Sequence, residues 1–139
     1  MQKEFELELD NLIVIVDYLK QLILQKGDCV VLLSGDLASG KTTLVKNFVK
    51  AYGGDDLVTS PTFSIQTIYS NDIFHYDIYN KGLEEFISLG LLEEFEKKGI
   101  HFVEWGDERL KELLISYGFN VITVKIEKKE NRRQYKIDA

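Results

Sequence analysis

Apolar and polar side chains follow two periods along this chain, one typical of strands and the other of helices. Residues 5–9 (Phe-Glu-Leu-Glu-Leu) change between apolar and acidic at every position, which predicts a half-buried strand. Residues 29–33 (Cys-Val-Val-Leu-Leu) are continuously apolar and predict a strand that is buried on both faces. Between them, apolar residues recur at helical spacing, so we expect a helix from residue 10 or 11 to about residue 25.

The rest of the chain continues this alternation. We expect strands over residues 63–69, 73–79, 100–103, 121–127 and 134–137, and helices over residues 41–52, 83–98 (interrupted near Gly90) and 107–117. The residues between the first two of these strands, Ser70-Asn71-Asp72, predict a hairpin turn. Helices that alternate with buried strands favour an α/β fold, here a three-layer α/β/α domain with a mixed, mostly parallel sheet.

The composition narrows the class of protein. A length of 139 residues suits one domain spanning residues 1–139, and 45% apolar with 29% charged residues is ordinary for a soluble globular protein. The formal net charge of -6 repels nucleic acid, so a phosphate site has to be built locally. The one cysteine, Cys29, excludes an intrachain disulfide and is expected to be buried. The sequence lacks a signal-peptide pattern and a long apolar run, so we expect a cytoplasmic protein without a membrane partner.

The segment after the strand at 29–33 carries the most specific chemical signal. Gly35-Asp36-Leu37-Ala38-Ser39-Gly40-Lys41-Thr42 satisfies the pattern G-x-x-x-x-G-K-[ST] between a buried strand and an amphipathic helix. Glycines permit the tight bends by which backbone N–H groups surround phosphate oxygens, and the helix start adds about half a positive charge. We therefore expect a P-loop NTPase fold that binds nucleotide and Mg²⁺ through Asp36, Leu37, Ala38, Ser39, Gly40, Lys41, Thr42 and Thr43.

Two residues of this loop have specific expected roles. Lys41 places its ammonium on the β- and γ-phosphates, and Thr42 offers its hydroxyl to magnesium. The chain has no N-K-x-D guanine motif, which favours ATP over GTP.

P-loops work with a second buried strand that ends in an acid near the metal. Residues 100–104 (Ile-His-Phe-Val-Glu) have this form, so Glu104 is the candidate for holding magnesium, directly or through water. The alternative is a surface glutamate at a strand end. Asp77 shares one strand face with His75 and is a second catalytic candidate, either for the metal or for orienting the attacking water. The alternative interpretation of Asp77 is a structural acid that caps the strand end. For His75 we expect a core histidine and assign no catalytic role.

Three further features allow two interpretations each. Thr62, after Pro61, is the third catalytic candidate, because a loop at this place in P-loop switches brings a hydroxyl to the γ-phosphate. The alternative is a loop whose shape Pro61 sets. Trp105 either packs structurally or stacks near the nucleotide or a partner. The four basic side chains within residues 128–133 indicate a solvated turn, with a phosphate or partner contact as the alternative.

Together these segments resemble one family, TsaE (also called YjeE), the small ATPase of bacterial tRNA threonylcarbamoyladenosine synthesis. The resemblance covers most of residues 30–106 and rests on the order and spacing of Gly35–Thr43, Ser60-Pro61-Thr62-Phe63, His75-Tyr76-Asp77-Ile78-Tyr79, Leu83-Glu84-Glu85-Phe86 with Leu89-Gly90, and Phe102-Val103-Glu104-Trp105. It implies ATP binding and hydrolysis in support of the partners TsaD and TsaB, which modify the adenosine next to the anticodon of tRNA. The chain would then meet tRNA indirectly, through that complex.

The resemblance also implies roles for single residues. Lys41 and Thr42 bind phosphate and magnesium, and Thr62 lies in a switch-like loop. Asp77 and Glu104 are the functional acids. Two segments depart from the usual pattern: Ala38-Ser39 stands where Gly-Ala is common, and Asn80 replaces a frequent arginine.

Two other functions stay open. A metabolite kinase usually needs an arginine-bearing lid, but the chain has only Arg109, Arg132 and Arg133 and no basic lid segment. A nucleotide-dependent assembly module would bring partners together and hydrolyse little ATP. None of the three arginines lies near the motifs in a position suited to an arginine finger, so we expect slow hydrolysis alone and an arginine supplied by a partner.

Overall fold

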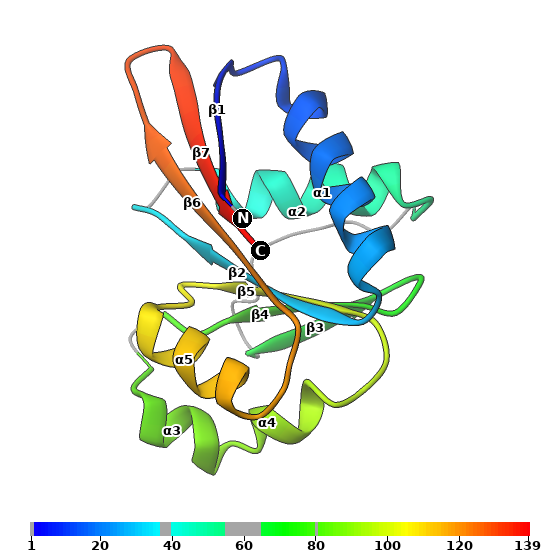
Figure 1. Cartoon of the computed structure of the whole chain (residues 1–139), viewed down its shortest axis with the longest axis vertical. Coiled ribbons are helices and arrows are strands. Elements are labelled where there is room, and N and C mark those ends of the chain that lie inside the picture. Colours follow the sequence, from blue (N-terminus) through cyan, green and yellow to red (C-terminus); the bar gives the residue numbers. More distant parts are fainter. Residues whose placement is uncertain (1, 37–39, 55–64, 80) are drawn as a thin grey trace.

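The computed structural model describes residues 2–36, 40–54, 65–79 and 81–139, which alternate between strands and helices (Figure 1). In chain order the elements are β1 (Gln2–Glu8), α1 (Leu12–Lys26), β2 (Cys29–Ser34), α2 (Lys41–Ala51), β3 (Gln66–Tyr69), β4 (Ile73–Asp77), α3 (Leu83–Ser88), α4 (Leu91–Glu94), β5 (Ile100–Glu104), α5 (Glu108–Ser116), β6 (Val121–Lys128) and β7 (Arg132–Asp138). Every expected element has a counterpart, with ends shifted by a few residues. The interruption near Gly90 is confirmed, because this residue has a φ of 74° and separates α3 from α4.

One sheet runs through the described residues in the order β1-β7-β6-β2-β5-β4-β3. Its central strands β6, β2, β5 and β4 are parallel neighbours. Antiparallel pairs extend both edges, β3 with β4 on one side and β6 with β7 and β1 on the other. A mixed sheet is therefore confirmed, but parallel pairing is limited to the centre, since tight hairpins join only antiparallel strands.

The expected hairpin turn between β3 and β4 is confirmed. Asn71 and Asp72 both have positive φ, 63° and 57°. Asparagine and aspartate tolerate this left-handed backbone better than other non-glycine residues, so they suit the three-residue connection Ser70-Asn71-Asp72. This turn brings Tyr69 opposite Ile73, so the register of β3 against β4 is set within a few residues.

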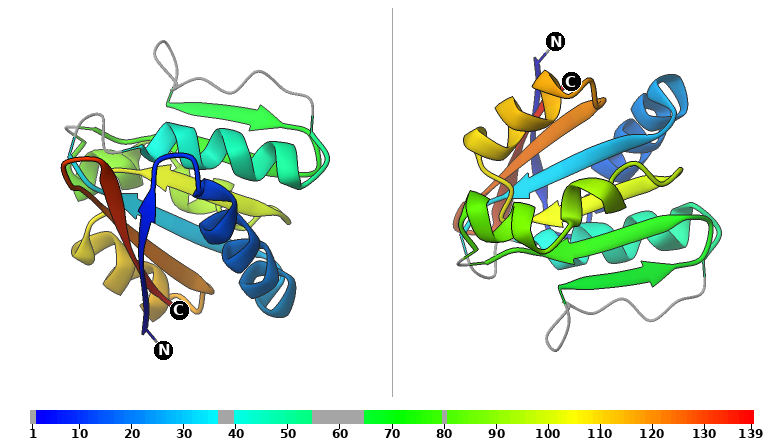
Figure 2. Two further views of the ribbon diagram at one scale, coloured as in Figure 1. Left: turned by 90° about the horizontal axis from the view of Figure 1, so that it is seen from above. Right: turned by 90° about the horizontal axis from the view of Figure 1, so that it is seen from below.

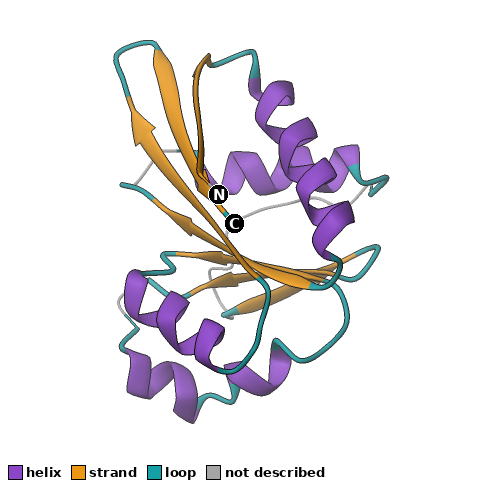
Figure 3. Cartoon of the chain, viewed as in Figure 1, coloured by secondary structure: helices purple, strands orange, loops and turns teal. Residues whose placement is uncertain are grey.

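Helices cover both faces of the sheet (Figures 1 and 3). We call the face that carries α1 and α2 the α2 face, and the face that carries α3, α4 and α5 the α5 face. Residues of β2 alternate between two cores: Cys29, Val31 and Leu33 pack on the α2 face, whereas Val30 and Leu32 pack on the α5 face. This explains why the segment is continuously apolar. The free Cys29 is buried as expected, and burial raises the pKa of its thiol to about 12.

The carboxyl ends of the central parallel strands lie at one edge of the sheet, which is where α/β proteins place ligands. Glu104 at the end of β5 is in register with Leu33 of β2 and with Asp77 at the end of β4. The two chain ends lie side by side, with Gln2 opposite Asp138, as both views of Figure 2 show. None of the helices within the described ranges is both long and apolar enough to span a membrane.

Candidate functional site

The phosphate loop connects β2 to α2. Gly35 and Gly40 have φ values of 148° and 108°, so both adopt the backbone conformation for which the motif uses glycine. Gly40 directly precedes the first residue of α2, an 11-residue helix whose N-terminus carries a positive partial charge. Of the expected contact residues, Leu37, Ala38 and Ser39 lie outside the described residues. Thr43 lies on the exposed side of the first turn of α2.

Lys41 is buried, with 5% of its surface exposed. Its Nζ donates hydrogen bonds to the carbonyl oxygens of Gly35 at 2.8 Å and Asp36 at 3.0 Å. It also lies 3.9 Å from the ring centroid of Trp105. Burial lowers the pKa of Lys41, because it disfavours the charged form, and the carboxylates of Glu104, Asp77 and Asp36 partly oppose this shift. The ammonium of Lys41 can therefore exchange these loop carbonyls for phosphate oxygens without passing through open solvent.

Thr42 and Glu104 meet although 62 residues separate them. The Thr42 hydroxyl donates to Oε2 of Glu104 at 2.8 Å. A hydroxyl that gives its proton to a carboxylate keeps its oxygen lone pairs for a cation. Hard oxygen donors of this kind suit Mg²⁺, which keeps several waters and substrate phosphates around it and rarely uses an all-protein cage. The described side chains contain no group of three His, Cys, Asp or Glu that could hold a metal.

Asp77 lies beside Glu104 on the neighbouring strand. Its carboxylate is close enough to Lys41 to act on the pKa of that lysine. The same carboxylate accepts a hydrogen bond from the backbone N–H of Tyr79 at 3.0 Å, which is the local capping role that the sequence left as the alternative. The geometry therefore brings Asp77 into the site and also gives it a structural contact.

His75 occupies a place that the sequence analysis did not foresee. It is fully buried, and its Nε2 lies 2.5 Å from Oε2 of Glu104. Its Nδ1 lies 2.9 Å from the hydroxyl of Tyr69. Four side chains thus form a continuous chain, Tyr69–His75–Glu104–Thr42, which we call the site chain. The period-two alternation that puts His75 on the same strand face as Asp77 was the available signal for it.

Trp105 combines packing with a place at the site. Its φ is 72°, which is rare and costly for a bulky residue. The backbone N–H donates to the carbonyl of Leu33 at 2.8 Å, and the ring lies 4.7 Å from that of Tyr79. A side chain at the next residue, Gly106, would come within 2.8 Å of Leu32, so only glycine fits there. Trp105 therefore packs in the structure and contacts Lys41, whereas its stacking near a nucleotide or a partner stays a prediction.

Arg133 corrects one expectation from the sequence. It begins β7 with Arg132, far along the chain from the phosphate loop, and no arginine was expected near the motifs. Its Nε nevertheless lies 3.9 Å from the position that a Cβ atom on Gly40 would occupy. The hairpin of β6 and β7 extends beyond the carboxyl end of β2 and brings this side chain to the loop. Arg133 therefore lies close to the loop, and the phosphate contact that the sequence left as the alternative stays a prediction for it.

A cleft of about 570 Å³ lies next to these residues. It opens on the α5 face and is lined by Ser34, Trp105, Lys111, Lys125 and Asp138, among others. Lys41, Thr42 and Glu104 do not line it. The candidate phosphate site thus lies at the start of α2, and Trp105 is next to both this site and the cleft.

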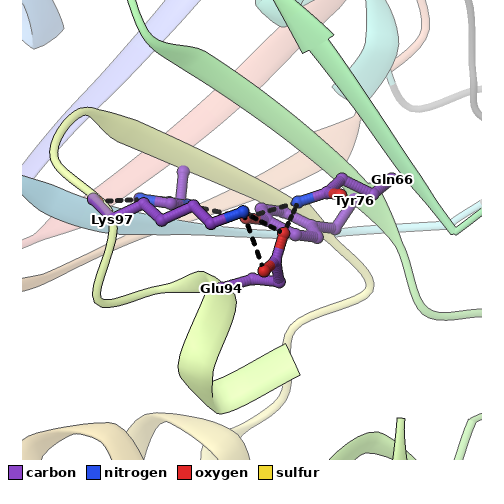
Figure 4. A network of polar contacts seen from close by, with 5 residues as sticks. Gln66, Tyr76, Glu94 and Lys97 are labelled. Atoms are coloured by element: carbon purple, nitrogen blue, oxygen red, sulfur yellow. Dashed lines mark hydrogen bonds and ion pairs between the residues drawn. The ribbon is translucent and has the colours of Figure 1, made fainter. Parts of the chain in front are cut away.

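A second polar network lies on the α5 face and uses the same strands, with Tyr76 and His101 buried and Glu94 and Lys97 partly exposed (Figure 4). The Tyr76 hydroxyl lies 2.7 Å from Nδ1 of His101, whose Nε2 donates to the carbonyl of Lys97 at 2.8 Å. The amide of Gln66 donates to Tyr76 at 3.3 Å and to Glu94 at 2.8 Å. Lys97 completes it with an ion pair to Glu94 at 3.0 Å. We call these residues the α5-face network.

Electrostatics in the α5-face network favour neutral aromatic groups beside one charged pair. Burial raises the pKa of Tyr76 and lowers the pKa of His101, so the hydroxyl keeps its proton and the imidazole resists gaining a second one. Hydrogen bonds from Gln66 and then Lys97 lower the pKa of Glu94. None of the expected site residues belongs to this network. The remaining expected positions, Thr62 and Asn80, lie outside the described residues.

Comparison with known proteins identifies relatives. The sequence model of the family "Threonylcarbamoyl adenosine biosynthesis protein TsaE" matches residues 10–135. The protein named tRNA threonylcarbamoyladenosine biosynthesis protein TsaE from Treponema pallidum is 36% identical over 94 residues, which cover 66% of this chain and 69% of that protein. The protein of the same name from Bacillus subtilis is 42% identical over 82 residues, covering 57% and 51%. The match thus spans between half and about two thirds of these relatives.

A solved structure supports the fold. The crystal structure of Bacillus subtilis YdiB superposes with a TM-score of 0.63 at 24% identity, covering 99% of this chain and 86% of that one. The family match extends over most of the chain and includes the phosphate loop, both candidate acids and Trp105. The chain belongs to the TsaE family.

Proposed function

We propose that this chain is a magnesium-dependent ATPase that supports the formation of threonylcarbamoyladenosine in tRNA, together with TsaD-like and TsaB-like partners. The names of its relatives support the biosynthetic role. We also propose that its layers of helix, sheet and helix are the three-layer P-loop NTPase fold in one domain, which the likeness to YdiB supports.

One observation carries the proposed activity. The Thr42 hydroxyl, in the first turn of α2, donates to Glu104 at 2.8 Å, and the ammonium of Lys41 lies on the adjacent loop carbonyls. A hydroxyl, a carboxylate and an ammonium at a helix N-terminus are the groups that a magnesium–triphosphate needs. In this acidic protein of net charge -6, the ammonium of Lys41 and the helix N-terminus supply the local positive charge for the phosphates.

Each residue has a separate role in this proposal. Lys41 leaves the carbonyls of Gly35 and Asp36 and donates to the β- and γ-phosphates. Thr42 and Glu104 would hold magnesium, which supplies positive charge to the phosphates during cleavage. Asp77 is proposed to orient the attacking water, and Thr62 to close over the γ-phosphate. The backbone N–H groups at the start of α2 bind the remaining phosphate oxygens.

The test is ATP turnover by the purified chain, alone and with TsaD-like and TsaB-like proteins. We expect slow hydrolysis alone and a clear increase in the complex. A rate typical of enzymes, on the order of 10 per second, that the partners leave unchanged would favour a stand-alone ATPase or kinase. Complex formation that requires ATP but does not consume it would instead favour an assembly module.

The proposed switch has its own test. If Thr62 responds to the γ-phosphate, backbone hydrogen exchange over residues 58–64 should slow with ATP and magnesium but not with ADP, since only ATP offers it a new contact. Equal exchange with ATP, with ADP and without nucleotide would remove Thr62 from the mechanism.

A further inference from the structure

The geometry points to His75 as a positioning residue for Glu104, with Tyr69 fixing the direction of the imidazole. The inference rests on the proposed function, because it assigns a further residue to the same magnesium–nucleotide site. Glu104 is buried, with 3% of its surface exposed. A carboxylate in such a place needs hydrogen-bond donors to stay charged and to keep one orientation.

Oε2 of Glu104 has two such donors on opposite sides. The Thr42 hydroxyl approaches at 2.8 Å from α2, and Nε2 of His75 approaches at 2.5 Å from β4. The Thr42 contact depends on the start of α2, next to the loop that has to accommodate nucleotide. The His75 contact comes from β4, which lies inside the sheet between β3 and β5, so it is the one that can hold Glu104 while the loop changes.

Tyr69 determines which imidazole nitrogen faces Glu104. Tyr69 lies on β3 diagonally across from His75, which pairs with Thr67, and its hydroxyl lies 2.9 Å from Nδ1. The tyrosine donates to Nδ1 of the neutral ring, and this leaves the proton on Nε2, where it points at Glu104. Nε2 carries a proton in the charged ring as well, so the positioning does not depend on the protonation state of His75.

Outer partners of this kind commonly change metal affinity by about 10- to 100-fold when they are removed. The relevant readout is the Mg²⁺ concentration that gives half of its effect on ATP binding, measured by calorimetry. We expect His75→Ala to raise this concentration about 10-fold or more, and Tyr69→Phe to raise it a few-fold. His75→Gln should restore most of the wild-type value, because the glutamine amide nitrogen lies as far along the side chain as Nε2. ATP binding without magnesium should stay at the wild-type level in all three.

Tyr76→Phe is the matched control, since it removes a buried tyrosine hydroxyl from an imidazole on the other face of the same sheet. It should leave the magnesium requirement unchanged. A second measurement needs no nucleotide: imidazole NMR of the chain, which has two histidines, should show a protonated Nε2 on His75. The His75→Gln spectrum assigns the signal.

The outcomes separate the inference from the function on which it rests. Wild-type protein whose ATP binding is indifferent to magnesium would overturn both. If the wild type depends on magnesium and His75→Ala has the same magnesium requirement, the positioning role alone is overturned. This holds whether or not the melting temperature of the variant changes. An unprotonated Nε2 on His75 would also overturn it. A raised requirement in His75→Ala that His75→Gln restores, with Tyr76→Phe unchanged, supports it.

Discussion

The site chain and the α5-face network are two versions of one arrangement on opposite faces of the same three strands. Each pairs a tyrosine hydroxyl with Nδ1 of a buried histidine, Tyr69 with His75 at 2.9 Å and Tyr76 with His101 at 2.7 Å. They differ in the group that Nε2 meets. His75 meets the carboxylate of Glu104 and, through it, Thr42, whereas His101 donates to the backbone carbonyl of Lys97.

This difference shows that the role of a buried histidine depends on which group lies at the far end of its chain of hydrogen bonds. The site chain ends at the start of α2, beside the phosphate loop. The α5-face network ends at Glu94 and Lys97, a pair on the outside of the protein around α4. We therefore expect changes in the site chain to alter nucleotide and magnesium binding, and changes in the α5-face network to alter stability alone.

Lys41→Ala gives the largest expected effect. Losing charge-assisted hydrogen bonds of about 1.5–3 kcal/mol each to phosphate oxygens should weaken ATP binding roughly 100- to 1,000-fold, as measured by calorimetry. Lys97→Ala removes an ammonium from the α5-face network and should leave ATP affinity unchanged. Equal ATP affinity for wild type and Lys41→Ala would refute the assignment of the phosphate loop.

Glu104→Gln should reduce hydrolysis more than binding. The amide keeps the size of the side chain but removes the charge that holds Thr42 and the metal, so we expect turnover to fall by about 100-fold with ATP affinity within about 10-fold. Phosphate release and calorimetry measure the two quantities. Glu94→Gln on the other face is the control, and loss of turnover in that variant would erase the distinction between the two networks.

Tyr76→Phe should affect stability without affecting the site. It leaves Nδ1 of the buried His101 without its donor, which costs about 1–3 kcal/mol of unfolding free energy. Chemical denaturation measures this loss. The idea that the α5-face network is structural would fail if Tyr76→Phe unfolded like wild type, or if it lowered ATP affinity.

The smallest expected effect is on the pH dependence of the unfolding free energy. Burial lowers the pKa of His101, so between that lowered value and the unfolded value near 6.5 the unfolded chain binds more protons than the folded chain. The unfolding free energy therefore falls as pH drops through this window, by up to about 1.4 kcal/mol per pH unit for one proton. His101→Asn keeps an acceptor for Tyr76 and should flatten this slope. An identical slope between pH 7 and 5 in wild type and variant would show that His101 does not cause it.

The sequence predicts the fold and the centre of the site well, because both depend on local patterns. Continuous or alternating apolar residues predict strands regardless of their neighbours, and the loop motif names Lys41 and Thr42 without any tertiary contact. Glu104 follows from the strand that it ends. The contact between His75 and Glu104 depends on the parallel pairing of β4 with β5, which no local pattern contains. Arg133 reaches Gly40 for a similar reason, since the length of the β6–β7 hairpin decides it.

A crystal structure with magnesium and a non-hydrolysable ATP analogue tests the central claim most directly. We expect the triphosphate along Gly35–Thr43, Lys41 on the β- and γ-phosphates, and Oγ1 of Thr42 on the metal. Glu104 should bind the metal directly or through one water, and His75 should still contact Glu104. Nucleotide bound away from this loop, for example in the cleft on the α5 face, or Glu104 beyond reach of a bridging water, would contradict the account.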